Sequence, residues 1–293
     1  MTTIEAVAGQ AFGAEVTDID LSVPLSPTEV GELRDALPRH RALRFPDQKI
    51  QPDDFVRFSM IFGRPHPHVL EHLRLEGHPE ILLLTNIVED ESKPNGHNGA
   101  AFWHTDNSYE PDHASATMLY ARSVPVQGGE TYLCDMVAAF RDLPESRRRF
   151  LEGLTVRHRY GNRDAGAEHD AGKLKPEQKA RVPEVEHELV KRHPVSGEKC
   201  LYAVAASARG IVGMPNDEAT ALLDELKVHC TQPKYTITQH YRVDDLFIWD
   251  TMVTMHAAAV MDVASNQSNT RIMHRISVKG YPGASGYAAS QAV

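Results

Sequence analysis

The sequence predicts a mainly β protein in which a few helices flank a sandwich or barrel of short strands. Short apolar runs dominate the chain, and most are bounded by glycine, proline or aspartate. Only three segments carry a helical pattern instead. The predicted strands are residues 42–45, 81–84, 116–121, 131–133, 201–204, 246–249 and 272–278.

The helical segments are residues 26–37, 53–62 and 216–229. The first begins with Ser26 followed by proline, which is typical of a helix start, and repeats apolar residues on one face. The same spacing recurs in the other two. We expect these apolar stripes to pack on the core rather than bind a cofactor.

Composition and charge narrow the functional classes. The 293 residues are 41% hydrophobic, enough for one large core, and we expect a single domain over 1–293. A net charge of −9 argues against nucleic acid and against an anionic membrane surface as partners. The sequence contains no apolar run of about 18 residues that could span a bilayer.

The three cysteines, Cys134, Cys200 and Cys230, are far apart and odd in number. This usage is typical of reduced thiols. Residues 1–10 also lack the basic and apolar regions of a signal peptide. A cytoplasmic protein is therefore expected.

Two polar segments interrupt the strands. Residues 86–100 lead directly into the first candidate site, and residues 161–190 are crowded with charge. A long loop inside a compact domain is usually functional or disordered. Residues 161–190 are interpreted as a lid or an insertion, with a solvated linker as the alternative.

The stretch FWHTDNSYEP, residues 102–111, carries the first chemical signal. On a strand, His104 and Asp106 would project from the same face, where an imidazole and a carboxylate suit a divalent metal. A hydrogen-bonded pair on a solvated strand is the alternative. Downstream, His256 is expected on the strand that follows Trp249 and Asp250. Two histidines and one aspartate form the facial triad of non-heme Fe(II) oxygenases, but a zinc hydrolase uses the same ligand types.

The segment RIMHRISVKG adds two cations near this site. Arg271 and Arg275 are four apart and would share a strand face with Met273. Buried guanidiniums need anionic partners, and arginine binds carboxylates through two hydrogen bonds. Two inward arginines therefore predict two anions, one of them a dicarboxylate cosubstrate. A pair of exposed arginines on an edge strand is the alternative.

With these motifs, the chain resembles the taurine dioxygenase/2,4-dichlorophenoxyacetate dioxygenase (TauD/TfdA) family of Fe(II)- and 2-oxoglutarate-dependent dioxygenases. The resemblance covers nearly the whole length, with its motifs in the family's order. They are GAEVTDIDLSVPLS (13–26), LRFPDQKIQPDDFVRFSMIFGRPH (43–66), WHTD (103–106), GGETYLCDM (128–136), HPVSGEK (193–199), WDTMVTMH (249–256) and RIMHR (271–275). It implies a double-stranded β-helix core, a relative of the jelly roll and cupin folds.

The resemblance also implies roles for individual residues. Fe(II) would be held by His104, Asp106 and His256. Arg271 would bind the far carboxylate of 2-oxoglutarate beside the Thr131 hydroxyl. The remaining two, Arg275 and His68, would face the primary substrate. A homo-oligomer, either a dimer or a tetramer, is expected as well.

The activity implied is hydroxylation of a small organic anion with O₂, giving succinate and CO₂. If the hydroxylated carbon also carries O, N or S, the product can collapse and the bond is cleaved. Candidate substrates are sulfonates, sulfate esters, aryloxyalkanoates and amino or hydroxy acids. Ala100 stands where the taurine enzyme has an amide that contacts its substrate, which argues against taurine. A zinc-dependent hydrolase and a non-enzymatic metal-binding barrel are the alternatives.

Overall fold

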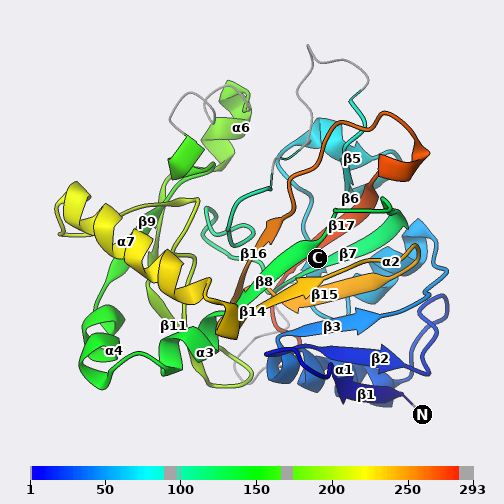
Figure 1. The fold of residues 1–293 in the computed structure, drawn as a ribbon, viewed down its shortest axis with the longest axis horizontal. Coiled ribbons are helices and arrows are strands. Elements are labelled where there is room, and N and C mark those ends of the chain that lie inside the picture. The colour runs from blue at the N-terminus through cyan, green and yellow to red at the C-terminus, as the bar shows by residue number, and fades with distance from the viewer. Residues whose placement is uncertain (1, 89–97, 99, 166–173, 284–293) are drawn as a thin grey trace.

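The core of the protein consists of two facing β-sheets. We describe it from a computed structural model, which covers residues 2–88, 98, 100–165 and 174–283. The larger sheet has nine strands in the order β1-β2-β3-β15-β7-β17-β6-β5, with β4 beside β17 (Figure 1). These strands are β1 (Thr3–Ala6), β2 (Ala14–Thr17), β3 (Ala42–Phe45), β4 (Arg64–Pro65), β5 (Arg74–Leu75), β6 (His78–Thr85), β7 (Ala116–Ser123), β15 (Leu246–Asp250) and β17 (Ile272–Lys279).

The smaller sheet has three strands and lies against the larger one. Its order is β14 (Thr236–Gln239), β8 (Thr131–Asp135) and β16 (Thr254–Ala258). A buried cluster joins the sheets: Leu133 and Ile237 from the smaller sheet pack with Phe247, Trp249 and Met273 from the larger one. Apart from the β2–β3 pair, the pairs that build these two sheets are antiparallel. The mainly β class is confirmed, and the arrangement is a jelly roll.

Two helices cover the outer face of the larger sheet. Helix α1 (Pro27–His40) begins with a capping box, in which the Ser26 hydroxyl accepts from the backbone N–H of Glu29 and the Glu29 carboxylate accepts from that of Ser26. Helix α2 (Pro52–Ser59) ends three residues before the predicted end. Both bury their apolar stripes against β3, β7 and β15, so the interpretation of the stripes as core packing is confirmed.

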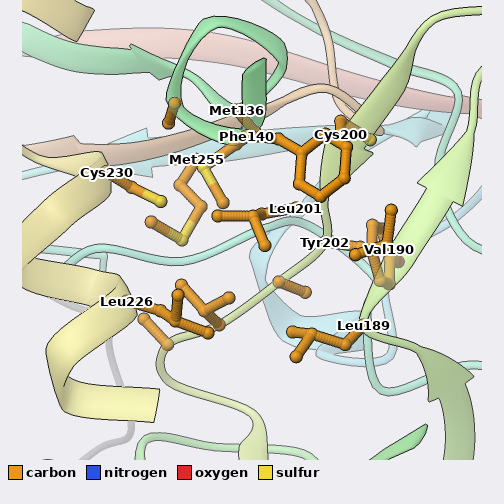
Figure 2. Close-up of a cluster of buried hydrophobic side chains, with 14 of the residues drawn as sticks. Met136, Phe140, Leu189, Val190, Cys200, Leu201, Tyr202, Leu226, Cys230 and Met255 are labelled. Carbon is orange, nitrogen blue, oxygen red and sulfur yellow. The ribbon is translucent and has the colours of Figure 1, made fainter. Parts of the chain in front are cut away.

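An α/β segment inserted between β8 and β14 covers the smaller sheet (Figure 1). Its elements are α3 (Met136–Arg141), α4 (Glu145–Glu152), β9 (Thr155–His158), η2 (Arg163–Ala165), α6 (Pro176–Arg181), β10 (Val185–Glu188), β11 (Val190–Arg192), β12 (Lys199–Leu201), β13 (Ala208–Ile211), α7 (Asn216–Cys230) and η3 (Pro233–Tyr235). Figure 2 shows how α7 and α3 pack on β12 and β16 through Leu226, Cys230, Phe140, Leu201 and Met255.

The sequence prediction differed here in three respects. Strands β9, β10, β11 and β13 were not predicted, because each has at most four residues and includes a charged one. Helices α3, α4 and α6 were missed, because each has at most eight residues and too few turns to establish an apolar stripe. The run 201–204 is a strand only at Leu201, where β12 ends. Residues 202–204 are buried but irregular. Their backbone pairs with no described strand, and their side chains pack in the core.

Three further findings bear on the sequence analysis. All three cysteines are free, as predicted, and all three are also buried. Within the described residues, no helix is long and apolar enough to cross a membrane. Of the two polar segments, residues 89–97, 99 and 166–173 lie outside the described residues. The short helices η1 (Glu71–Leu73) and η4 (Gln267–Asn269) complete the described fold.

Candidate active site

The backbone holds His104 and His256 side by side. Their N–H and C=O groups exchange two hydrogen bonds, each 2.9 Å long, which form an isolated antiparallel bridge at β16. The two imidazole centroids are 4.1 Å apart. A residue pair joined by two backbone hydrogen bonds has both of its Cα–Cβ directions fixed, so the two rings converge on one point.

Asp106 completes the cluster from a turn. Its carboxylate oxygens lie 3.5 Å from Nε2 of His104 and 3.6 Å from Nε2 of His256. The three ligand atoms lie within 4.8 Å of one another. The predicted triad is therefore assembled. The strand predicted at 104–106 is wrong, however: pairing ends at His104, and Asp106 lies in the turn that follows.

The protonation pattern of the triad suits a cation. Nδ1 of His104 lies 2.8 Å from the Phe102 carbonyl, so Nδ1 carries the hydrogen and Nε2 presents a lone pair. Burial lowers the pKa of His256, which keeps that ring neutral. Although burial alone raises the pKa of Asp106, the neighbouring Arg275 and the two histidines hold it well below its usual range. Oδ2 of Asp106 is buried without a hydrogen-bond partner, as expected of a metal ligand.

Arg275 forms an ion pair with this cluster. Its Nη2 lies 2.9 Å from Oδ1 of Asp106 and donates to the Ser277 hydroxyl at 2.8 Å. The sequence analysis predicted an anionic partner for Arg275, and one such partner is the Asp106 carboxylate of the chain itself. A carboxylate two residues from His104 already balances its charge, which a linear sequence motif does not reveal.

A cavity of about 160 Å³ lies beside the triad. His104, Asp106 and Arg275 line one part of it. Apolar and aromatic side chains line most of the remainder: Leu70, Leu73, Leu82, Leu84, Phe102, Tyr109 and Tyr160. Met118 does not line the cavity and is buried in the core under α1 and α2. The cavity thus combines one charged corner with a largely apolar interior.

His68 borders the same cavity as Arg275. Its Nδ1 accepts a hydrogen bond of 3.1 Å from the backbone N–H of Leu70. Burial, reinforced by the Arg275 charge, lowers the pKa of His68 to about 3, so the ring is neutral near pH 7. A neutral ring that accepts at Nδ1 carries its hydrogen on Nε2. His68 can therefore donate a hydrogen bond to a ligand.

Arg271 and Thr131 lie together between the two sheets. The Arg271 guanidinium donates from Nε to the Gly129 carbonyl at 3.1 Å, and burial lowers its pKa. Among the described residues, no carboxylate forms an ion pair with it. Arg271 is half-buried, and a desolvated guanidinium without an anion is costly, so this site fits a ligand carboxylate. As predicted, Arg271 and Arg275 both face the interior between the sheets, although a β-bulge separates them at Ile272 and Met273.

Sequence reasoning missed two aromatic residues at the site. The Trp249 ring packs on the His256 imidazole with a centroid distance of 4.7 Å. The Tyr241 hydroxyl donates to the Thr131 hydroxyl at 2.9 Å. Trp249 was named only as a strand end, and Tyr241 lies in a loop before β15, where no spacing rule singles it out.

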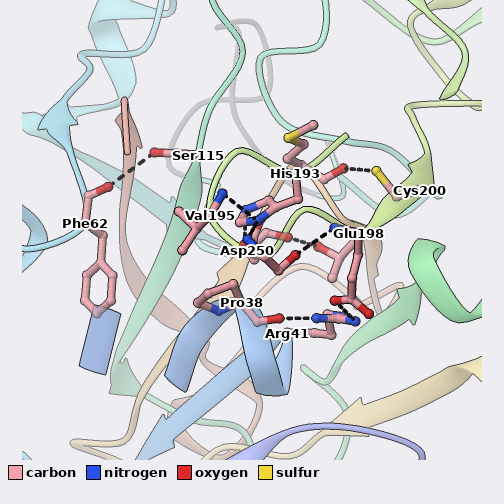
Figure 3. Close-up of polar contacts among 12 residues, drawn as sticks. Pro38, Arg41, Phe62, Ser115, His193, Val195, Glu198, Cys200 and Asp250 are labelled. Atoms are coloured by element: carbon pink, nitrogen blue, oxygen red, sulfur yellow. Dashed lines mark hydrogen bonds and ion pairs between the residues drawn. The ribbon is translucent and has the colours of Figure 1, made fainter. Parts of the chain in front are cut away.

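A separate set of buried polar contacts supports the β15–β16 turn (Figure 3). Nε2 of His193 lies 2.9 Å from Oδ2 of Asp250, and both side chains are almost fully buried. The Cys200 thiol lies 3.6 Å from the Met252 carbonyl in the same turn. These contacts immobilise the turn that leads into His256.

The arrangement does not favour a metal hydrolase. Such an enzyme needs a free general base beside the metal-bound water. Glu110 is the nearest described candidate in the chain, four residues after Asp106. Its carboxylate is already held by His66 at 2.9 Å, by Lys279 and by Asn107. Neither this group nor Asp106 is free to act as a base.

Comparisons with known proteins agree with this geometry. The family model "Taurine catabolism dioxygenase TauD, TfdA family" matches residues 3–277. An alpha-ketoglutarate-dependent 2,4-dichlorophenoxyacetate dioxygenase from Burkholderia sp. (strain RASC) is 30% identical, covering 89% of this chain and 90% of the relative. A pentalenolactone F synthase from Streptomyces avermitilis is 29% identical, covering 88% and 89%.

Solved structures give the same result. A putative alpha-ketoglutarate-dependent taurine dioxygenase from Burkholderia xenovorans superposes with a TM-score of 0.78 at 28% identity, covering 97% of this chain and 96% of that one. AAD-2 in complex with Mn(II) and N-oxalylglycine superposes with a TM-score of 0.77 at 28% identity, covering 96% and 98%.

Proposed function

Because the chain belongs to the TauD/TfdA family of dioxygenases, we propose that it uses Fe(II), 2-oxoglutarate and O₂ to hydroxylate an organic acid with a bulky apolar body. One observation carries the substrate class. The cavity beside the metal triad has a cationic and hydrogen-bonding corner at Arg275 and His68, and a lining that is otherwise mainly apolar. A carboxylate fits the corner, and an aryl or alicyclic group fits the lining.

The triad would hold the metal. His104 and His256 would supply imidazole nitrogens, with burial lowering the pKa of His256, and Asp106 would supply a carboxylate whose pKa lies well below its usual range. A metal bound by three ligands on one side keeps its other positions open for cosubstrate and O₂. Together with these two molecules, it would supply the oxidising chemistry that hydroxylates the substrate. The chain positions this centre through the His104–His256 backbone bridge and the Trp249 ring.

Arg271 and Thr131 would bind the far carboxylate of 2-oxoglutarate. The half-buried guanidinium of Arg271 forms no ion pair among the described residues, and Tyr241, which donates to the Thr131 hydroxyl, has its ring centroid 5.9 Å from the guanidinium carbon. A dicarboxylate that reaches from the metal to Arg271 would satisfy both groups. Enclosure between the two sheets also keeps water from this end of the cosubstrate.

The primary substrate would place its anion between Arg275 and His68. Arg275 already contacts Asp106 and Ser277 through Nη2, and the rest of its guanidinium fork remains for a second anion. His68 would add a neutral N–H donor. Of the candidate classes, aryloxyalkanoates and related apolar acids match the apolar lining best. Taurine would contact little of this lining, because it has no large apolar group.

The test uses a matched pair of substrates, an aryloxyalkanoic acid and its neutral amide, with succinate formation as the readout. Wild type should prefer the acid strongly in kcat/KM. Since Arg275 also touches the metal ligand Asp106, Arg275→Gln will lower activity on both compounds, so the acid-to-amide ratio decides. The proposal requires the acid-to-amide ratio of kcat/KM in Arg275→Gln to be a small fraction of the wild-type ratio. An unchanged ratio would exclude Arg275 as the anion-binding residue, and His68→Phe would then be tested.

A further inference from the structure

Tyr241 connects the two groups that would bind the cosubstrate. It lies in the loop between β14 and β15, with its ring buried between the sheets. Its hydroxyl donates to Thr131 Oγ1 at 2.9 Å, and the guanidinium carbon of Arg271 lies 5.9 Å from its ring centroid. One side chain therefore touches both Thr131 and Arg271.

The direction of the Tyr241–Thr131 hydrogen bond determines what Thr131 can do. Burial raises the pKa of Tyr241 to about 12, so the phenol keeps its hydrogen. A phenol is a better donor than an aliphatic alcohol, and the bond from Tyr241 occupies one lone pair of the threonine oxygen. The single hydrogen of Thr131 is then left for another acceptor. A carboxylate beside Arg271 is such an acceptor.

The Tyr241 ring is also the end of a row of aromatic side chains. It packs edge-on against Phe247 at a centroid distance of 6.2 Å, and Phe247 lies 5.7 Å from Trp249. Trp249 in turn lies 4.7 Å from the metal-ligand ring of His256. The row Tyr241–Phe247–Trp249 thus spans the space between Arg271 and the metal ligand. Rings in edge or tilted contact have little freedom to shift, so the row fixes this separation.

We propose that Tyr241 is a positioning residue for 2-oxoglutarate: its hydroxyl orients Thr131 toward the far carboxylate, and its ring sets how far Arg271 lies from the metal. This inference rests on the proposed function, because it concerns the cosubstrate of the same site. It predicts two separable effects. The hydroxyl governs affinity for the far carboxylate, and the ring governs which chain length of dicarboxylate fits.

The first test measures binding by calorimetry in anaerobic, Mn(II)-loaded protein. Tyr241→Phe removes the hydroxyl and keeps the ring. Its affinity for 2-oxoglutarate should fall about fivefold, the usual effect of losing one hydrogen bond. Its affinity for 2-oxopentanoate, which lacks the far carboxylate, should not change. An equal loss for both ligands would mean a merely structural role and would overturn the proposal.

A double-mutant cycle isolates the path through Thr131. In a Thr131→Val background, Tyr241→Phe should have no further effect on 2-oxoglutarate affinity, since the hydroxyl it orients is gone. Additive losses in the double variant would overturn the proposed path. Wild-type protein that binds neither 2-oxo acid would instead contradict the proposed function itself.

The second test addresses the ring. Wild type and Tyr241→Phe should both prefer 2-oxoglutarate to 2-oxoadipate, which is one methylene longer, by a similar factor. Tyr241→Leu removes the ring, and the preference should fall severalfold because Arg271 loses its support. Equal preference in all three proteins would show that the row does not set the spacing.

Discussion

Asp106 would share its carboxylate between the Arg275 guanidinium and, in the loaded enzyme, the metal. This sharing explains why Arg275 can be buried before any substrate binds. The triad itself could be predicted from the sequence, because ligand type and motif order are linear properties. The Arg275–Asp106 pair and the Tyr241–Thr131 bond could not, because each joins residues more than 100 positions apart in the chain.

Replacing Arg271 tests the cosubstrate end of the site. Arg271→Ala should raise the KM for 2-oxoglutarate at least about tenfold, because a charged hydrogen-bonded contact contributes on the order of 2 kcal/mol. The KM for the primary substrate should stay within about twofold, as this substrate is expected at Arg275. Steady-state kinetics with each ligand varied in turn measures both. An unchanged KM for 2-oxoglutarate would exclude Arg271 from the cosubstrate pocket.

Glu110 gives the protein a specific acid sensitivity. Burial by itself raises its pKa, but hydrogen bonds and charges from His66 and Lys279 outweigh burial and hold it at about 2. A lowered folded-state pKa stabilises the protein above the unfolded value of about 4.3, and this contribution is lost as the pH falls toward 2.

Glu110→Gln should therefore unfold with a shallower pH dependence than wild type between pH 5 and about 2. The difference in unfolding free energy across this window should be on the order of 3 kcal/mol, measured by urea titration at several pH values. Equal pH dependence of the unfolding free energy in the two proteins would contradict the lowered pKa of Glu110.

At the scale of elements, the turn before β8 shapes the cosubstrate end. Gly128 and Gly129 both have φ of +80°, so any side chain there is strained. They differ in what surrounds them: a Cβ on Gly129 would lie 3.0 Å from Pro125 and 3.2 Å from Cδ of Arg271, whereas a Cβ on Gly128 would meet nothing within 4 Å. Comparing a substitution at Gly128 with the same substitution at Gly129 therefore distinguishes the effect of backbone strain from the effect of displacing Arg271.

Gly129→Ala should raise the KM for 2-oxoglutarate severalfold, because the added methyl group pushes against Arg271. Gly128→Ala should lower the thermal unfolding temperature to a similar degree but leave this KM nearly unchanged. The two variants are compared by kinetics and by thermal unfolding. Equal KM values in both would show that the turn does not position Arg271.

The strands and long helices were predictable where an apolar pattern repeats over several residues, as in β7, β17 and α7. Prediction failed where tertiary contacts replace the pattern. His104 has its partner strand for only one residue, and α6 is short and charged. The backbone bridge between His104 and His256 depends on two loops, and their lengths alone do not determine it.

At the scale of the whole molecule, the site lies where the jelly roll meets the inserted α/β segment. Leu174 and Val182, which flank α6, pack with Val69, Leu70 and Tyr109 at the cavity. Gln178 of α6 also donates to the Val69 carbonyl at 2.8 Å. The single domain over 1–293, a cytoplasmic location and a homo-oligomer stay predictions.

The lid hypothesis for residues 161–190 can be tested on their described part. If α6 closes the cavity, hydrogen exchange in residues 174–182 should slow when substrate is added to the anaerobic complex with Fe(II) and 2-oxoglutarate, because lids become ordered on binding. Mass spectrometry measures the exchange, with α7 as an internal reference. The same exchange with and without substrate would leave α6 as a passive wall.

The central claim is that His104, Asp106 and His256 form the iron site of a 2-oxoglutarate-dependent dioxygenase. The most direct measurement is Fe(II)-dependent formation of succinate from 2-oxoglutarate in the presence of an aryloxyalkanoic acid, for wild type and His256→Ala. We expect turnover in wild type and none in the variant, with both proteins folded by circular dichroism. Iron-dependent turnover at the wild-type rate in His256→Ala would contradict the account.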